Sequence, residues 1–249
     1  MVGVNMTITD MLHRRNDLST FLVHYTKVTA DDATGFEALK SIVTSSMIEA
    51  RTAYGAAAQS PDPEVRKSQR VVCFTETPLE HSWTMTRELA ERRAFKFAPY
   101  GVVITKTFAR RNRCNPVWYV NCTPGYTWPM KAINAAVAAE TRPFSDEESM
   151  LRVAPYIEQM GDWTSGPYIN RKEFWWEREW RRVGDFFVPP RNTVALLAPS
   201  HHHGELREVL EDAGQWSPRN VPILDPNWGL ERMIACMSGV AADDVGPFP

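Results

Sequence analysis

Two short stretches of the sequence carry residue types that can bind a nucleotide and stabilise a cationic sugar. His24, Tyr25 and Thr26 follow directly on an apolar run with the composition of a strand. Far downstream, Glu177 and Glu179 are two residues apart, so in a strand both carboxylates would point to the same face. A histidine and a hydroxyl at one strand end, with a glutamate across the sheet, can grip a nucleotide cofactor. We therefore expect function to depend on whether the two stretches meet.

Each stretch also has a plainer interpretation. A histidine at a strand end commonly bonds only to backbone, and for His24 taken alone this interpretation is favoured. Glu177 and Glu179 could lie on a surface strand and pair with an arginine at 178, 181 or 182, which contributes little when the pair is exposed. The tryptophans that alternate with the glutamates weaken this second interpretation, because aromatics and charges mixed along one strand are costly unless a site uses them.

Basic residues gather in several places that could contact phosphates. The run from 87 to 96 is interleaved with glutamates and is typical of a solvated helix face. Arg110, Arg111 and Arg113 have no acidic neighbour in the sequence, so this cluster is the better candidate for phosphate contact. Arg178 lies between the two glutamates and is a further candidate for contact with an acceptor.

Composition places the chain among ordinary globular proteins. It has 249 residues, of which 43% are hydrophobic and 23% charged, and its net charge of −2 provides no global field toward nucleic acid or membrane. Apolar runs are too short to span a bilayer. The four cysteines form no CxxC pair and no signal peptide is recognisable, so we expect free thiols in the cytoplasm. We expect no metal, since the adjacent histidines His201–His203 cannot all face one ion on regular structure.

Hydrophobic periodicity and capping signals predict mixed helices and strands. We expect helices over 8–18, 33–47, 78–95, 129–140, 145–160, 205–213 and 230–237, and strands over 21–25, 70–75, 100–108, 116–121, 173–183, 193–198 and 221–224. Residues 50–66 are rich in alanine, serine and proline and predict a mobile loop that borders the site. Strands do not alternate regularly with helices, which favours an α+β fold. No linker divides the chain, so we expect one domain over 1–249, with a core over about 20–200 and a helical extension over about 201–242.

The order of the motifs resembles that of the AbiGi-type abortive-infection proteins of bacteria and phages. The motifs are His24-Tyr25-Thr26, Leu39-x-x-Ile42, Val72-Cys73-Phe74-Thr75-Glu76-Thr77-Pro78-Leu79, Gly101-Val102-Val103, Asn115-Pro116-Val117-x-Tyr119 and Glu177-x-Glu179-Trp180-Arg181. More distantly, the chain is similar to ADP-ribosyltransferases of the DarT kind. The resemblance covers about 21–183 and implies an ADP-ribosyltransferase-like split mixed and antiparallel β core with flanking helices.

The resemblance also implies a reaction and roles for the two glutamates. NAD as substrate would lose nicotinamide through a transition state with positive charge on the ribose, as in glycoside hydrolysis. A preorganised carboxylate stabilises charge that develops only there. The resemblance gives this role to Glu179, through a hydrogen bond to the ribose 2′-hydroxyl, while Glu177 would orient or deprotonate the acceptor.

Further residues are implied in binding NAD: His24, Tyr25, Thr26, Tyr54, Phe74 and Thr75. His24 would hold the adenosine-side ribose and Thr26 the carboxamide region. A ring of Tyr25, Tyr54 or Phe74 would stack on nicotinamide. Phe74 or Thr75 would line the cofactor pocket, at the end of its strand.

Two classes of function remain open from the sequence. The first is an NAD-dependent ADP-ribosyltransferase-like toxin or effector in the conflict between bacterium and phage, which modifies nucleic acid or protein and has a cognate antitoxin. A nucleobase acceptor would have to be single-stranded or flipped, and the tryptophans and arginines would then stack on bases and contact phosphates. The second class is a catalytically inactive module with the same fold that binds a partner or a nucleotide, as an antitoxin would. No spacing matches a metal-dependent nuclease.

Overall fold

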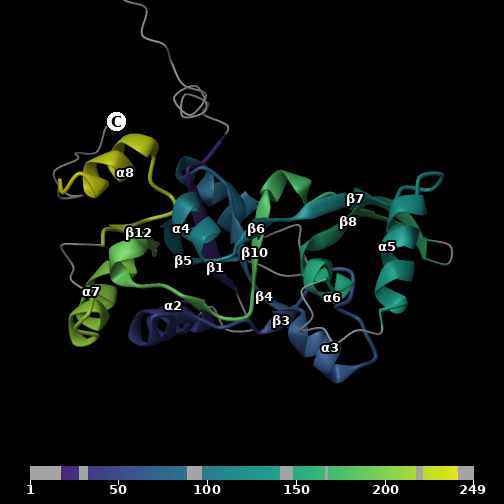
Figure 1. Cartoon of the computed structure of the whole chain (residues 1–249). Coiled ribbons are helices and arrows are strands. Elements are labelled where there is room, and N and C mark those ends of the chain that lie inside the picture. Colours follow the sequence, from purple (N-terminus) through teal and green to yellow (C-terminus); the bar gives the residue numbers. More distant parts are fainter. Residues whose placement is uncertain are drawn as a thin grey trace, which may run out of the picture. The chain divides into compact units, whose positions relative to one another are not determined.

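The structure is a computed structural model, and it describes residues 18–27, 33–88, 97–140, 148–165, 168–216 and 221–240 (Figure 1). The chain forms two compact units. Unit 1 comprises Met1–Met47, Glu76–Ala109 and Val188–Pro249, and unit 2 comprises Ile48–Thr75 and Arg110–Phe187. Each unit therefore combines segments that are distant in the sequence. The single domain over 1–249, with its core and its helical extension over 201–242, stays a prediction.

Unit 1 contains strands in the order β13-β12-β5-β1. Their bounds are β1 Phe21–Lys27, β5 Phe97–Thr105, β12 Thr193–Leu197 and β13 Ile223–Leu224. β5 pairs antiparallel with both β1 and β12, and β12 pairs parallel with β13. Val102, Val103 and Ile104 of β5 are fully buried, so both faces of this strand are covered. A run of β-branched residues suits such a position.

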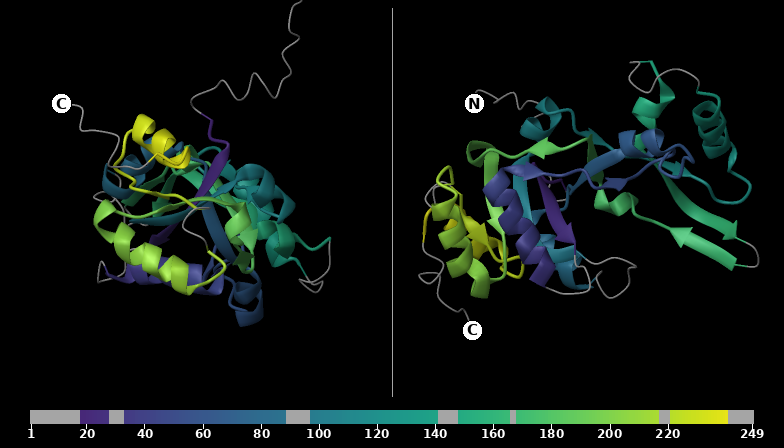
Figure 2. Two further views of the ribbon diagram at one scale, coloured as in Figure 1. Left: turned by 90° about the vertical axis from the view of Figure 1, so that its left-hand side faces the viewer. Right: turned by 90° about the horizontal axis from the view of Figure 1, so that it is seen from below.

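Unit 1 also contains helices and short helical turns. They are α2 Ala33–Ser45, α7 His203–Asp212 and α8 Leu230–Met237, with short 3-10 turns at Leu79–His81, Pro190–Asn192 and Ser200–His202 and a π turn at Thr84–Glu88. Phe36, Leu39 and Val43 form the buried stripe of α2. α7 runs beside α2 (Figure 2), and Lys40 Nζ lies 2.9 Å from Glu205 Oε1 across the two helices.

Unit 2 contains two groups of strands. In the first group β4 (Arg70–Thr75) lies between β3 (Thr52–Ala53) and β10 (Glu179–Val183), and β10 also pairs with β6 (Asn115–Pro116), all antiparallel. In the second group β8 (Ile157–Ser165) pairs parallel with β7 (Trp118–Asn121) and antiparallel with β9 (Tyr168–Lys172). The chain also forms the two-residue strands β2 (Met47–Ile48) and β11 (Phe186–Phe187).

The helices of unit 2 are short, and their starts follow known signals. They are α3 Pro63–Ser68, α5 Trp128–Ala138 and α6 Met150–Val153, while α4 (Lys106–Arg111) follows β5. Asp62 accepts a hydrogen bond from the backbone N–H of Glu64 at 2.8 Å, just before the proline that opens α3. Ser149 caps α6 in the same way through the N–H of Leu151 at 3.2 Å.

The α+β prediction, with mixed and antiparallel strands, is confirmed. Most predicted elements are present with bounds that differ by a few residues at most, and α8 has the predicted bounds. The helix predicted over 8–18 lies outside the described residues, apart from its last residue. Among the described helices none is long and apolar enough to cross a bilayer.

Several predicted elements are wrong. Residues 157–165 form β8 where a helix over 145–160 was expected, and the described part of 78–95 forms 3-10 and π turns in place of one regular helix. β9 had no counterpart in the prediction. The predicted loop over 50–66 contains β3 and the start of α3, and its Ala57 is buried against Leu151 and Ala154. Small side chains pack where backbones approach closely: a Cβ at Gly55, whose φ is +91°, would lie 2.0 Å from the Ala154 carbonyl oxygen.

Candidate functional site

The two glutamates do not share one strand. Trp175–Glu177 forms a 3-10 turn that ends at Arg178 in the left-handed conformation, with φ 46°, and β10 begins only at Glu179. The expectation that Glu177 and Glu179 point to one face of a strand is therefore wrong, because a turn reorients the chain between them. Glu177 is buried, and its backbone carbonyl accepts a hydrogen bond from the Thr75 hydroxyl at 2.7 Å.

Glu179 is held by a neighbour on its own strand. The Arg181 guanidinium donates from Nε to Glu179 Oε1 and from Nη2 to Glu179 Oε2, both at 2.9 Å. Positions two apart on a strand share a face, which is why the two side chains meet. The plainer interpretation, in which Glu179 pairs with a nearby arginine, is thus correct about the pair. It is wrong in placing the pair on an exposed surface. The Arg181 side chain is 2% exposed and that of Glu179 is 15% exposed.

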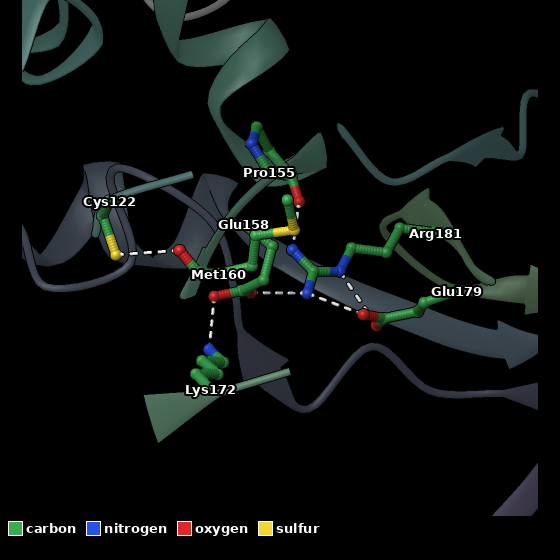
Figure 3. A network of polar contacts seen from close by, with 7 residues as sticks. All are labelled: Cys122, Pro155, Glu158, Met160, Lys172, Glu179 and Arg181. Atoms are coloured by element: carbon green, nitrogen blue, oxygen red, sulfur yellow. Dashed lines mark hydrogen bonds and ion pairs between the residues drawn. The ribbon is translucent and has the colours of Figure 1, made fainter. Parts of the chain in front are cut away.

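Arg181 is also anchored to residues far away in the sequence (Figure 3). Its Nη1 donates to the Pro155 carbonyl and its Nη2 to Glu158 Oε2, both at 2.7 Å. The other oxygen of Glu158 lies 2.5 Å from Lys172 Nζ. Four side chains of alternating charge therefore follow one another in space: Lys172, Glu158, Arg181 and Glu179. We call them the Arg181 network.

Burial and charge act in opposite directions on the ionisable groups of this network. Burial by itself would lower the pKa of Arg181, but the Glu179 carboxylate beside it raises this pKa above its ordinary value. Burial by itself would raise the pKa of Glu158, but Arg181 and Lys172 together hold it below its ordinary value. Both groups are therefore charged at neutral pH, as a buried ion pair requires.

Two tyrosines belong to the surroundings of the Arg181 network. The Tyr54 ring centroid lies 4.9 Å from the Arg181 guanidinium carbon, within the range of a cation–π interaction. Tyr119 is the register partner of Glu158 on the paired strands β7 and β8. Its hydroxyl is buried and has no hydrogen-bond partner among the described residues. Burial, and after it the charge of Glu179, raises the pKa of Tyr119.

Phe74 and Thr75 lie on β4 directly beside the start of β10. Thr75 is the register partner of Glu179, and Phe74 that of Trp180. The Phe74 ring is buried and meets the Phe186 ring edge-on, with centroids 5.0 Å apart. Tyr54, Phe74, Thr75 and both glutamates are thus brought together within unit 2, with Phe74 in a packing position.

The remaining predicted cofactor residues belong to unit 1. Tyr25 is buried in the core against Phe97, and its hydroxyl lacks a partner among the described residues. The Thr26 hydroxyl is buried and donates to the Tyr100 carbonyl at 3.3 Å. His24 is half-buried on β1. Its backbone closely approaches β5 at Gly101, where a Cβ would lie 2.5 Å from the His24 carbonyl oxygen. That this trio and Glu179 line one cleft stays a prediction.

The predicted acceptor-contacting arginines all belong to unit 2. Arg110, Arg111 and Arg113 are exposed around the end of α4, while Arg178 is half-buried in the turn before β10. Several indoles of unit 2 are exposed as well, among them Trp118 and Trp175. Among the described residues no group of three or more His, Cys, Asp and Glu side chains is arranged to hold a metal.

The arrangement around β10 provides an oriented carboxylate that is only partly exposed.

A family described as "Putative abortive phage resistance protein AbiGi, antitoxin" matches residues 40–196, which is more than half of the sequence. The chain belongs to the AbiGi family. This confirms the resemblance that the order of the motifs predicted.

The predicted distant similarity to DarT also appears among solved structures. The DarT protein of Thermus sp. 2.9 in complex with NAD⁺ matches with 10% sequence identity and a TM-score of 0.38, over 84% of this chain and 96% of that one. No curated protein matches the chain.

Sequence reasoning missed three members of this AbiGi chain's network as functional candidates. From the sequence alone, Arg181 is only a surface partner of the glutamates, although the Glu-x-Arg spacing within a strand does indicate a pair. The sequence patterns predict a helix at Glu158 and no element at Lys172. Both come from the hairpin of β8 and β9, which no local pattern had revealed.

Proposed function

We propose that this AbiGi-family protein is an NAD-dependent ADP-ribosyltransferase of phage defence, with Glu179 as its catalytic carboxylate. The supporting observation is that this side chain is both fixed in orientation and partly exposed. Its carboxylate is fixed by the bidentate contact with Arg181 and remains 15% exposed, while the arginine behind it is 2% exposed. A charged group held in advance at the edge of a buried network costs little reorganisation when positive charge develops near it.

In this proposal the chain stabilises a ribose that becomes cationic as nicotinamide leaves. Glu179 accepts a hydrogen bond from a ribose hydroxyl and opposes the developing charge. Glu177, buried at the preceding turn, orients or deprotonates the acceptor. Tyr54 supplies an aromatic ring on the guanidinium side of the network. His24 and Thr26 bind NAD as the family resemblance implies.

The acceptor in this proposal is a nucleic acid or a protein. Exposed arginines and exposed indoles in unit 2 support the nucleic acid, because indoles stack on unpaired bases and guanidinium groups contact phosphates. The arginines concerned are Arg110, Arg111 and Arg113. Replacing all three by glutamine should reduce transfer to nucleic acid without changing hydrolysis of NAD, whereas an unchanged transfer would favour a protein acceptor.

The test of the activity is incubation of the full chain with labelled NAD and total cell extract. Label transferred to nucleic acid or protein identifies both the reaction and the acceptor. Glu179→Gln keeps the shape and removes the charge, so we expect kcat to fall by roughly 100- to 1,000-fold, as for loss of one transition-state contact. Glu173→Gln is the matched control, since Glu173 lies six residues earlier and its side chain is 55% exposed. Equal activity of both variants would exclude Glu179 as the catalytic group.

The alternative function is a non-catalytic binding module, as the word antitoxin in the family's description would suggest. One observation favours it: both oxygens of Glu179 already accept hydrogen bonds from Arg181, which partly neutralises the carboxylate. In that case the wild-type protein would neither hydrolyse nor transfer NAD, and the Glu179→Gln variant would lose stability but no activity.

A further inference from the structure

We propose that Arg181 is a positioning residue, which acts on the reaction only by fixing the carboxylate of Glu179. This inference rests on the proposed function, because positioning has meaning only where Glu179 takes part in a reaction. It adds to that function a second residue that the chemistry needs, one that touches neither substrate nor acceptor.

The guanidinium of Arg181 is fixed at every nitrogen. Nε and Nη2 hold the two oxygens of Glu179 at 2.9 Å, Nη2 also donates to Glu158, and Nη1 donates to the Pro155 carbonyl at 2.7 Å. Tyr54 packs its ring against the guanidinium. A planar fork held in this way can present its two parallel donors in only one plane. The Glu179 carboxylate must lie in the same plane to accept both.

One anchor of Arg181, the Glu158 carboxylate, is itself held by the charge of Lys172. Lys172 contacts the oxygen of Glu158 that Arg181 does not use. The side chains are 29% exposed at Lys172, 14% at Glu158 and 15% at Glu179, whereas that of Arg181 is only 2% exposed. The geometry of the Glu179 carboxylate is therefore imposed by Arg181, the most buried member of the network.

Arg181→Lys would retain the positive charge but lose the two parallel N–H donors of the guanidinium. One ammonium group cannot hold both oxygens of Glu179 and also reach Glu158 and the Pro155 carbonyl in the present planar geometry. We expect the Glu179 carboxylate to rotate or shift in Arg181→Lys, and a displacement of about 1 Å can cost on the order of 100-fold in rate.

The experiment is a double-mutant cycle on NAD turnover with Arg181→Lys and Glu179→Gln. In the wild-type background, Arg181→Lys should lower kcat by roughly 10- to 100-fold and leave KM for NAD nearly unchanged. In the Glu179→Gln background it should have almost no further effect, since the carboxylate that it positions is gone. Arg182→Lys, at the next position of β10, is the matched control and should leave kcat unchanged.

The outcomes separate the two proposals. A loss in Glu179→Gln together with the same factor of loss from Arg181→Lys in both backgrounds would overturn positioning and leave the proposed function in place. Full activity of Glu179→Gln, or no turnover by the wild-type protein, would overturn both. If Arg181→Lys does not fold, as judged by circular dichroism, Glu158→Gln removes one anchor of Arg181 and carries the same test, with an expected loss of roughly 3- to 10-fold in kcat that must vanish in the Glu179→Gln background.

Discussion

Replacing Arg181 by methionine should destabilise the protein strongly, because it leaves two carboxylates without their shared cation. The side chains of Glu158 and Glu179 are only 14% and 15% exposed, and the Pro155 carbonyl would lose its donor. Removing one partner of a buried ion pair costs about 3–5 kcal/mol. We expect Arg181→Met to lower the free energy of unfolding by about this amount, a large part of the roughly 5–15 kcal/mol of a typical domain.

The assay is urea unfolding of the full chain at pH 7, followed by tryptophan fluorescence. The matched control is Arg171→Met, since Arg171 also pairs with a carboxylate, at 2.8 Å from Asp162, but is 67% exposed. An exposed pair contributes about 0–1 kcal/mol, so the control should unfold almost as the wild-type protein does.

The pH dependence gives the prediction a second, independent readout. In the wild-type protein the pKa of Glu158 is lowered in the folded state, so its contribution to stability is present above about pH 4.5 and is lost as pH falls below that value. In Arg181→Met the same carboxylate is buried without its arginine and takes up a proton more readily. The loss in free energy of unfolding caused by Arg181→Met should therefore become smaller between pH 7 and pH 4. A loss below about 1 kcal/mol at pH 7, or one that does not change with pH, would refute a buried network that depends on charge.

Two further predictions concern residues outside the network. Gly55→Ala should lower the free energy of unfolding in urea clearly more than the matched control Gly125→Ala. Both glycines have φ near +90°, which costs about 1–2 kcal/mol with a side chain, but of the two only at Gly55 would the new Cβ meet backbone, at 2.0 Å. Equal losses in the two variants would contradict the close packing around Gly55. Burial lowers the pKa of His203, so the folded state keeps it neutral while the unfolded chain gains a proton below about pH 6.5. Wild-type stability should thus fall between pH 6.5 and pH 5, His203→Gln should lose this slope, and the exposed His201→Gln should keep it; a slope that persists in His203→Gln would assign it to other groups.

Elements whose sequence is locally consistent could be predicted well. In α2 the apolar residues recur at helical spacing, and all of those that define the pattern are buried in the structure. β5 is a run of β-branched residues between two other strands, where only a strand fits. For such segments, local propensity and tertiary packing favour the same structure.

The errors lie where long-range pairing overrides a local pattern. Residues 157–160 fall at the end of the helix predicted over 145–160, yet they form the start of β8 because they pair with β7, while 161–165 pair with β9. The turn between the two glutamates depends on a left-handed arginine, and arginine gives no signal for that conformation. The Glu179–Arg181 pair was within reach of sequence reasoning, since it depends only on strand spacing. Glu158 could not be found without the correct assignment of β8.

The Arg181 network is difficult to explain as a device for stability alone. Buried ion pairs lose much of their Coulombic gain to desolvation, and well-packed apolar residues of similar volume commonly stabilise a fold as well or better. A chain that needed only to join β10 to the β8 region could do so with leucine or methionine at 158, 179 and 181. Apolar residues could not provide a partly exposed carboxylate whose orientation is fixed by a buried guanidinium. The cost of burying these charges is understandable if the carboxylate of Glu179 is the part of the network that is used.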